Sequence, residues 1–144
     1  MKRHPSLAPL SREHHPVLML AQLLKKDGPA YKGMPTEPAE KAAYALNLFH
    51  ADIKGHFSKE EMLLQKLAGL NTQIDMFATE IMQEHQELAS GFVGIASSKD
   101  LVNELDVLGR KLEQHIRKEE RELFPLIEQY CPKALLDEIA PLLK

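Results

Sequence analysis

The apolar residues of this chain recur with the period of an α-helix along nearly every long stretch. The strict alternation of apolar and polar residues that is typical of strands does not occur in the sequence. Four long amphipathic segments are joined by short connections. We therefore expect an all-α fold: an antiparallel up-down-up-down four-helix bundle with a short C-terminal fifth helix.

Capping and helix-breaking residues set the expected limits of these helices. Ser11 is the expected N-cap of the first helix, Thr72 and Asp75 are expected to form a capping box for the third, and Pro125 is expected to kink or end the fourth. The four long helices are predicted over about 11–27, 37–67, 72–97 and 100–124, and the fifth over 132–140.

Size and charge narrow the classes of protein to consider. With 144 residues the chain fits one domain, expected over 1–144 with a flexible stretch at 1–10. Its 18 basic and 21 acidic residues give a formal charge of −3 and no basic stripe, which argues against nucleic acid and membrane partners. The lone Cys131 and the lack of a recognisable signal peptide favour the cytoplasm.

A six-residue pattern occurs twice in the chain. His-Phe-Ser-Lys-Glu-Glu at 56–61 recurs as His-Ile-Arg-Lys-Glu-Glu at 115–120, fifty-nine positions later. The two copies fall on the second and fourth expected helices. The repeat implies two related halves, each made of a helix pair.

Each copy of the repeat pairs a histidine with a glutamate four residues later, so that the two side chains share one helix face. His56 with Glu60, and His115 with Glu119, lie on apolar stripes that should face the bundle interior. His14 and His85 occupy the apolar stripes of the first and third expected helices. In an antiparallel bundle all of these groups reach a similar depth.

Four imidazoles and two carboxylates in one apolar interior need a compensating partner, because buried polar groups without one are costly. A pair of metal ions would supply it, and nitrogen and oxygen ligands suit iron, zinc or manganese. The absence of thiolates excludes a zinc-finger type of site. The predicted metal ligands are His14, His56, Glu60, His85, His115 and Glu119.

Four further histidines and glutamates lie outside the predicted ligand set. His15 lies nearer the rim of its helix and His50 lies on a different face from the ligands, and a contribution from either stays open. Glu61 and Glu120 follow the predicted ligands by one residue and should point away. We expect them in solvent or in salt bridges rather than on the metal.

These motifs resemble the hemerythrin-like, or HHE, cation-binding family over almost the whole chain. The resemblance rests on Glu13-His14, the first repeat, Glu84-His85 and the segment 115–125, which is the most specific. It implies a four-helix bundle around a non-haem di-iron centre, with an oxo or hydroxo bridge between the ions. The family pattern implies His14 and His56 on one iron, His85 and His115 on the other, and Glu60 and Glu119 bridging.

One departure from the family affects the expected function. Oxygen-carrying members have an extra histidine one turn from the third-helix histidine, where this chain has Ile81 and Ala89. We therefore expect a non-enzymatic protein that binds or senses O2 or NO, or handles iron, alone, as a homodimer or with a protein partner. The alternatives are a di-iron oxidase or peroxidase, an iron-delivery or iron–sulfur cluster repair factor, a metal-free interaction module, and zinc in place of iron.

Overall fold

A computed structural model describes residues 2–144, and all of its regular structure is helical, with no strand among those residues. The predicted all-α fold is confirmed. The helices are α1 (Ala8–Leu24), α2 (Pro38–Leu48), α3 (Lys54–Lys66), α4 (Thr72–Gly94), α5 (Leu101–Lys118), α6 (Phe124–Tyr130) and α7 (Lys133–Ile139), with the short segments η1 (Phe49–Ile53), η2 (Ile95–Ser97), η3 (Glu119–Leu123) and η4 (Ala140–Leu143).

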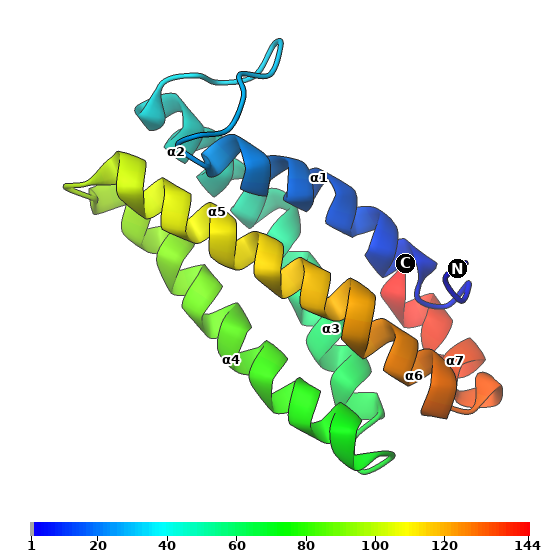
Figure 1. Ribbon diagram of the computed structural model, residues 1–144. Coiled ribbons are helices and arrows are strands. Elements are labelled where there is room, and N and C mark those ends of the chain that lie inside the picture. The colour runs from blue at the N-terminus through cyan, green and yellow to red at the C-terminus, as the bar shows by residue number, and fades with distance from the viewer. Residues whose placement is uncertain (1) are drawn as a thin grey trace.

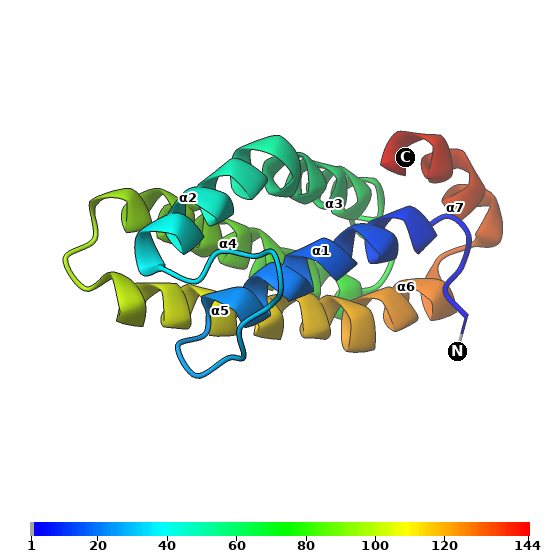
Figure 2. The same ribbon diagram turned by 90° about the horizontal axis from the view of Figure 1, so that it is seen from above.

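Four helical rods lie side by side in Figure 1: α1, the continuous run from α2 to α3, α4, and the continuous run from α5 to α6. The first rod packs against α5 and against the α2–α3 rod, while α4 packs against α3 and α5. The short helix α7 lies at the end of the molecule where both termini are found (Figures 1 and 2). Within residues 2–144, no helix combines the length and apolarity needed to cross a lipid bilayer.

The first helix begins earlier than the sequence predicts. Instead of starting after an N-cap at Ser11, α1 starts at Ala8 with Pro9 in its first turn, and it ends at Leu24. The extra turn is stabilised by the burial of Leu10 in the core. Residue 1, the first of the expected flexible stretch 1–10, lies outside the described residues.

The start of α4 is predicted correctly, but its cap is not. Asn71 is the N-cap, and its side-chain oxygen accepts hydrogen bonds from the backbone N–H groups of Gln73 and Ile74. The expected capping box of Thr72 and Asp75 does not form, because the Asp75 carboxylate accepts from the backbone of Gly69 instead.

Two π-helical segments interrupt the second and fourth rods without breaking them. The segment η1 joins α2 to α3, and η3 joins α5 to α6. Pro125 does not end the fourth rod: it lies in the first turn of α6, directly after η3, and the rod continues to Tyr130.

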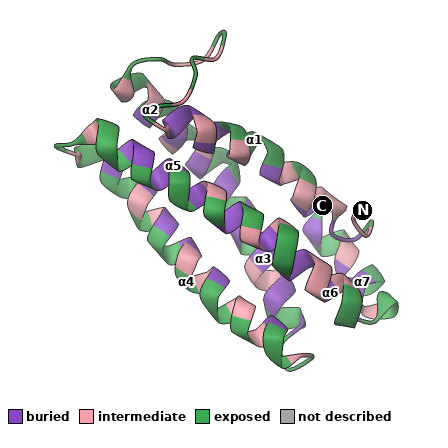
Figure 3. Cartoon of the chain, viewed as in Figure 1, coloured by how far each residue is buried: buried purple, intermediate pink, exposed green. Residues whose placement is uncertain are grey.

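The apolar core consists of two clusters, one toward each end of the rods. One cluster includes Phe49 and Phe92, and the other includes Leu63 and Phe124. The inward faces of the rods carry the buried residues (Figure 3). A fully buried side chain of this size stabilises the fold by roughly 1.5–3 kcal/mol. The buried histidines and glutamates stand between the clusters, as His85 does on α4.

Candidate metal centre

The six sequence-predicted residues come together in the middle of the bundle. The first rod supplies one histidine, α3 a histidine and a glutamate, and α4 one histidine. The last turn of α5 and the first residue of η3 supply the remaining pair. All six are buried, with between 0% and 5% of their surface exposed: His14, His56, Glu60, His85, His115 and Glu119.

Their ligand-type atoms form two overlapping groups, and within each group these atoms lie no more than 4.8 Å apart. One group contains His14 and His56, and the other contains His85 and His115. Glu60 and Glu119 belong to both groups. Two ions placed in these groups would therefore share both carboxylates.

The two oxygens of Glu60 face different histidine pairs. Its Oε2 lies 3.2 Å from Nε2 of His14 and 3.0 Å from Nε2 of His56, while its Oε1 lies 3.1 Å from Nε2 of His85. Glu119 places a single oxygen, Oε1, 3.1 Å from Nε2 of His14 and 3.4 Å from Nε2 of His115. Both carboxylates thus lie between the two groups.

Several of these close approaches lack the angles of a hydrogen bond. Nε2 of His56, Nε2 of His115 and both carboxylate oxygens of Glu119 are buried without a hydrogen-bond partner among the described residues. A buried polar atom left without a partner costs about 1–3 kcal/mol. Metal ions at the centre of each group would satisfy these atoms, and imidazole with carboxylate suits iron, zinc or manganese. The donor set therefore fits a metal site.

The centre perturbs the titration of its members. Burial lowers the pKa of His14, but contacts with Glu119, Glu120 and Glu60 outweigh it and raise that pKa to about 12. Burial would raise the pKa of Glu60, but the positive charge of His56 and contacts with neighbouring histidines hold it well below its usual range. Burial and then the charge of Glu60 raise the pKa of Glu119 to about 7. The site thus attracts positive charge, and metal binding would release protons from it.

A second layer of glutamates contacts the outward-facing nitrogens of the histidines. The Nδ1 atoms approach carboxylate oxygens in four pairs: His14 with Glu120 at 3.2 Å, His56 with Glu13 at 2.8 Å, His85 with Glu61 at 2.9 Å, and His115 with Glu84 at 2.7 Å. We refer to these four residues as the outer glutamates.

The sequence alone does not reveal the role of the outer glutamates. The expectation that Glu61 and Glu120 lie in solvent or in salt bridges is confirmed by their pairing with His85 and His14, but they do not point away from the site. Glu13 and Glu84 are singled out only as part of the family resemblance. The signal was present in the doubled glutamates of the repeat and in the two Glu-His dipeptides. What the sequence could not supply was the packing that aims each carboxylate at a histidine of another helix.

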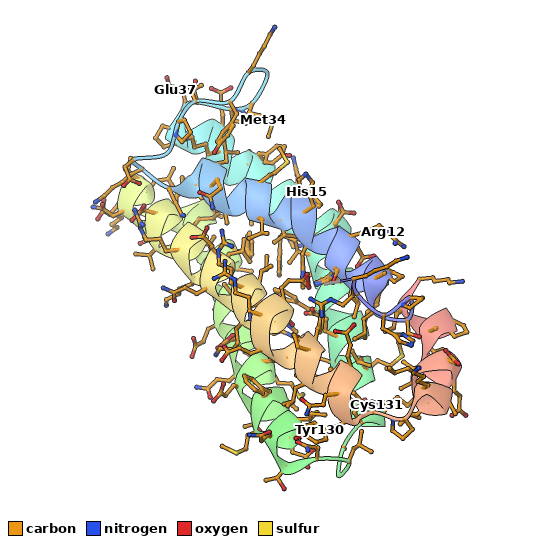
Figure 4. All side chains as sticks on the ribbon, turned by 45° about the vertical axis from the view of Figure 1, so that its right-hand side comes forward. Arg12, His15, Met34, Glu37, Tyr130 and Cys131 are labelled. Atoms are coloured by element: carbon orange, nitrogen blue, oxygen red, sulfur yellow. The ribbon has the colours of Figure 1, made fainter. Side chains whose placement is uncertain are left out.

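His15 and His50, whose contribution the sequence leaves undecided, do not join the centre. His15, labelled on α1 in Figure 4, is exposed, and so is His50. Neither belongs to the two groups of ligand-type atoms.

Aromatic side chains pack against the imidazoles from inside the bundle. The Phe57 ring stacks on His85 at a centroid distance of 3.9 Å and meets His115 edge-on at 5.7 Å. The Phe124 ring lies parallel to His14 at 5.7 Å. Both phenylalanines are buried, so they limit the movement of the imidazole rings that they contact.

Each half of the centre lies beneath a surface pocket. A pocket of about 700 Å³ between α1 and the α2–α3 rod is lined by His56 and its outer glutamate Glu13. A smaller pocket of about 250 Å³ between α4 and α5 is lined by His115 and its outer glutamate Glu84. One histidine of each group therefore lines a surface pocket.

Buried histidines from four helical rods, with two carboxylates common to both groups, are the features of a helical cation-binding protein. A family model described as the hemerythrin HHE cation-binding domain matches residues 7–127. The chain belongs to this family, and the resemblance seen in the sequence is confirmed. Comparisons with curated proteins and with solved structures found no match.

Proposed function

We propose that this protein holds a non-haem di-iron centre through His14, His56, Glu60, His85, His115 and Glu119. The observation that carries this proposal is the buried pair of histidine–glutamate groups, in which several donor atoms have no partner among the described residues. Membership of a cation-binding family supports it. Zinc or manganese would fit the same donors, and the family pattern favours iron.

The proposal includes an antiparallel up-down-up-down order for the four rods. Short connections between successive rods support it, as between Leu67 and Thr72 and between Ser97 and Leu101. So does the convergence of histidines from four separate helices on one level of the bundle.

We further propose that the iron pair binds or senses a small diatomic ligand, O2 or NO, and that the protein is not itself an enzyme. Each iron ion would have two histidine ligands and would share two carboxylates with the other ion. The pair would supply redox chemistry and would keep coordination positions free for such a ligand. Ile81 and Ala89 occupy the positions one turn from His85, where oxygen carriers have an extra histidine, and this departure favours sensing over transport. The surface pockets beside His56 and His115 offer short routes to the centre.

Iron handling through a protein partner is the second role we retain, because His56 and His115 each line a surface pocket.

We propose a cytoplasmic location, since the one cysteine of the chain, Cys131, is buried and unpaired.

Absorption spectra of the protein loaded with Fe²⁺ test the proposal. Exposure to O2 should produce the near-ultraviolet charge-transfer bands of a ferric pair, and NO should produce a distinct spectrum. His56→Ala and His115→Ala should lose these bands, while His15→Ala should keep them as the matched control. If neither O2 nor NO changes the spectrum of the iron-loaded protein, the proposed binding of a diatomic ligand is wrong. Peroxide turnover well above that of free iron would favour the oxidase or peroxidase alternative instead.

A further inference from the structure

The outer glutamates are arranged in a closed ring. Each reaches the histidine of the next rod in chain order rather than one on its own helix. Glu13 of α1 contacts α3, Glu61 of α3 contacts α4, Glu84 of α4 contacts α5, and Glu120 of η3 returns to α1. Every rod thus both supplies and receives one such contact.

Other side chains fix three of these carboxylates in place. Lys59 donates to Glu13 at 2.8 Å, and Lys118 forms the matching ion pair with Glu84. These two lysines occupy the same position of the six-residue repeat. Glu120 accepts from the Ser11 hydroxyl at 2.8 Å. The orientation of the carboxylates is therefore determined by the fold.

The contacts with the outer glutamates favour one tautomer of each neutral imidazole. A neutral histidine carries its proton on one nitrogen and a free lone pair on the other. A carboxylate next to Nδ1 stabilises the proton there, which leaves the lone pair of Nε2 facing the middle of the bundle. A metal ion in either group requires that lone pair. The outer glutamates also make each imidazole a stronger ligand, because its Nδ1–H is hydrogen-bonded to a negatively charged carboxylate.

We propose that Glu13, Glu61, Glu84 and Glu120 are positioning residues that orient the four histidines for metal binding, and that Lys59 and Lys118 hold two of them. This inference rests on the proposed function, since it takes the six inner residues as metal ligands.

Four positions of the six-residue repeat each have a role in this arrangement. The first histidine is a ligand, the lysine holds the outer glutamate of the preceding rod, the first glutamate is shared between the two groups, and the second glutamate orients the histidine of the next rod. The repeat therefore links each rod to both of its neighbours in the chain.

Zinc binding to variants of α4 tests the proposal, with affinity measured by competition against a chromophoric chelator. Glu84→Ala should weaken zinc binding about 10–100-fold. Glu84→Gln keeps an oxygen that can accept from Nδ1, so its loss should be smaller. The matched control is Glu80→Ala, because Glu80 also contacts Lys118, at 3.3 Å, but its side chain is 53% exposed and forms no hydrogen bond or ion pair with a histidine among the described residues. It should bind zinc as the wild type does.

Nuclear magnetic resonance of the zinc-loaded proteins gives the readout specific to positioning. In the wild type, all four ligand histidines should show an Nδ1–H proton that exchanges slowly with water. Glu84→Ala, and to a lesser degree Glu84→Gln, should change that signal for His115, on the neighbouring helix, and leave His85, which is next in sequence, unchanged. A general loss of structure would alter all four signals.

The outcomes separate the two proposals. A wild type that binds no metal would overturn the proposed function and this inference with it. A wild type that binds metal with Glu84→Ala of equal affinity, or with unchanged His115 signals, would overturn the inference alone. The inference also fails if Glu80→Ala weakens zinc binding as much as Glu84→Ala does.

Discussion

At the scale of single residues, the two buried carboxylates are not equivalent. Glu60 directs one oxygen toward His14 and His56 and the other toward His85, whereas Glu119 has only Oε1 near histidine nitrogens. The low pKa of Glu60, held down against burial by the charge of His56, keeps it ionised, while the pKa of Glu119 rises to about 7. Because its two oxygens face both histidine pairs, we expect Glu60 to contribute more than Glu119 to the proposed metal site.

Replacing this shared carboxylate should affect both metal positions. Glu60→Gln keeps the side-chain volume but removes the charge and one acceptor oxygen, so the variant should retain less than one metal ion per chain. His85→Ala should lose only the ion of its own group. Metal analysis after desalting measures both, with exposed Glu122→Gln as the control. Two ions bound to Glu60→Gln would contradict the shared role.

The convergence of the four histidines and two glutamates of the centre could be predicted from the sequence, because each lies on an apolar stripe, where a polar side chain is unusual. The outer glutamates could not, because they lie toward the rim, where exposed and functional carboxylates look alike. Glu61 is 36% exposed at its side chain and still contacts His85. Only the neighbouring helix distinguishes it from an ordinary surface glutamate.

At the scale of elements, α1 and α5 approach each other closely, and Gly109 makes this possible. A Cβ atom at Gly109 would lie 2.7 Å from the backbone oxygen of Ala21 and 3.0 Å from Cβ of Leu24. The contact aligns the helices that carry His14 and His115.

Gly109→Ala should therefore destabilise the protein by roughly 1–3 kcal/mol, the usual cost of overpacking. Gly55→Ala is the matched control, because nothing lies within 4 Å of its added Cβ, and it should gain up to about 1 kcal/mol from the higher helix propensity of alanine. Urea unfolding measures both free energies. Equal stability of Gly109→Ala and the wild type would mean that the two backbones are farther apart.

A polar contact joins the same two helices near their exposed edge. Glu113 of α5 accepts from Lys25 at 2.7 Å and from Gln22 at 2.5 Å, both at the C-terminal end of α1. The ion pair with Lys25 is the main reason that the pKa of Glu113 falls to about 2.

A carboxyl with a lowered pKa stabilises the fold above its unfolded pKa of about 4.5, and that stabilisation is lost as pH falls toward the folded pKa. Glu113→Gln should be less stable than the wild type near pH 7 by about 1 kcal/mol or less. The difference should shrink as pH falls from 5 to 2, measured by urea unfolding at each pH. Glu104→Gln, on an exposed position of α5, serves as the control. A difference independent of pH would contradict the assigned ion pair.

At the scale of the whole molecule, the polar centre divides the apolar core into two clusters. Either cluster alone joins the rods at one end, and the histidines and glutamates occupy the level between them. Each rod carries apolar residues on both sides of its histidine: Leu10 and Val17 flank His14 and belong to different clusters.

The continuity of the second rod agrees with the single helix predicted over 37–67, whereas the fourth rod continues past Pro125, where the sequence predicted a kink or an end. Nothing in the sequence indicated the π-helical segments η1 and η3. These segments depend on backbone hydrogen bonds that shift by one residue, which side-chain patterns do not encode. The start of α1 was missed for a related reason: burial of Leu7 and Leu10 outweighed the local preference for a cap at Ser11.

The number of iron ions bound per chain tests the central claim most directly. The protein would be loaded with Fe²⁺ without oxygen, desalted and analysed for metal and protein together. We predict two ions per chain in the wild type and in His15→Ala, and a clear loss in His56→Ala and His115→Ala. No bound metal in the wild type, or an unchanged metal content in the His56 and His115 variants, would contradict the account.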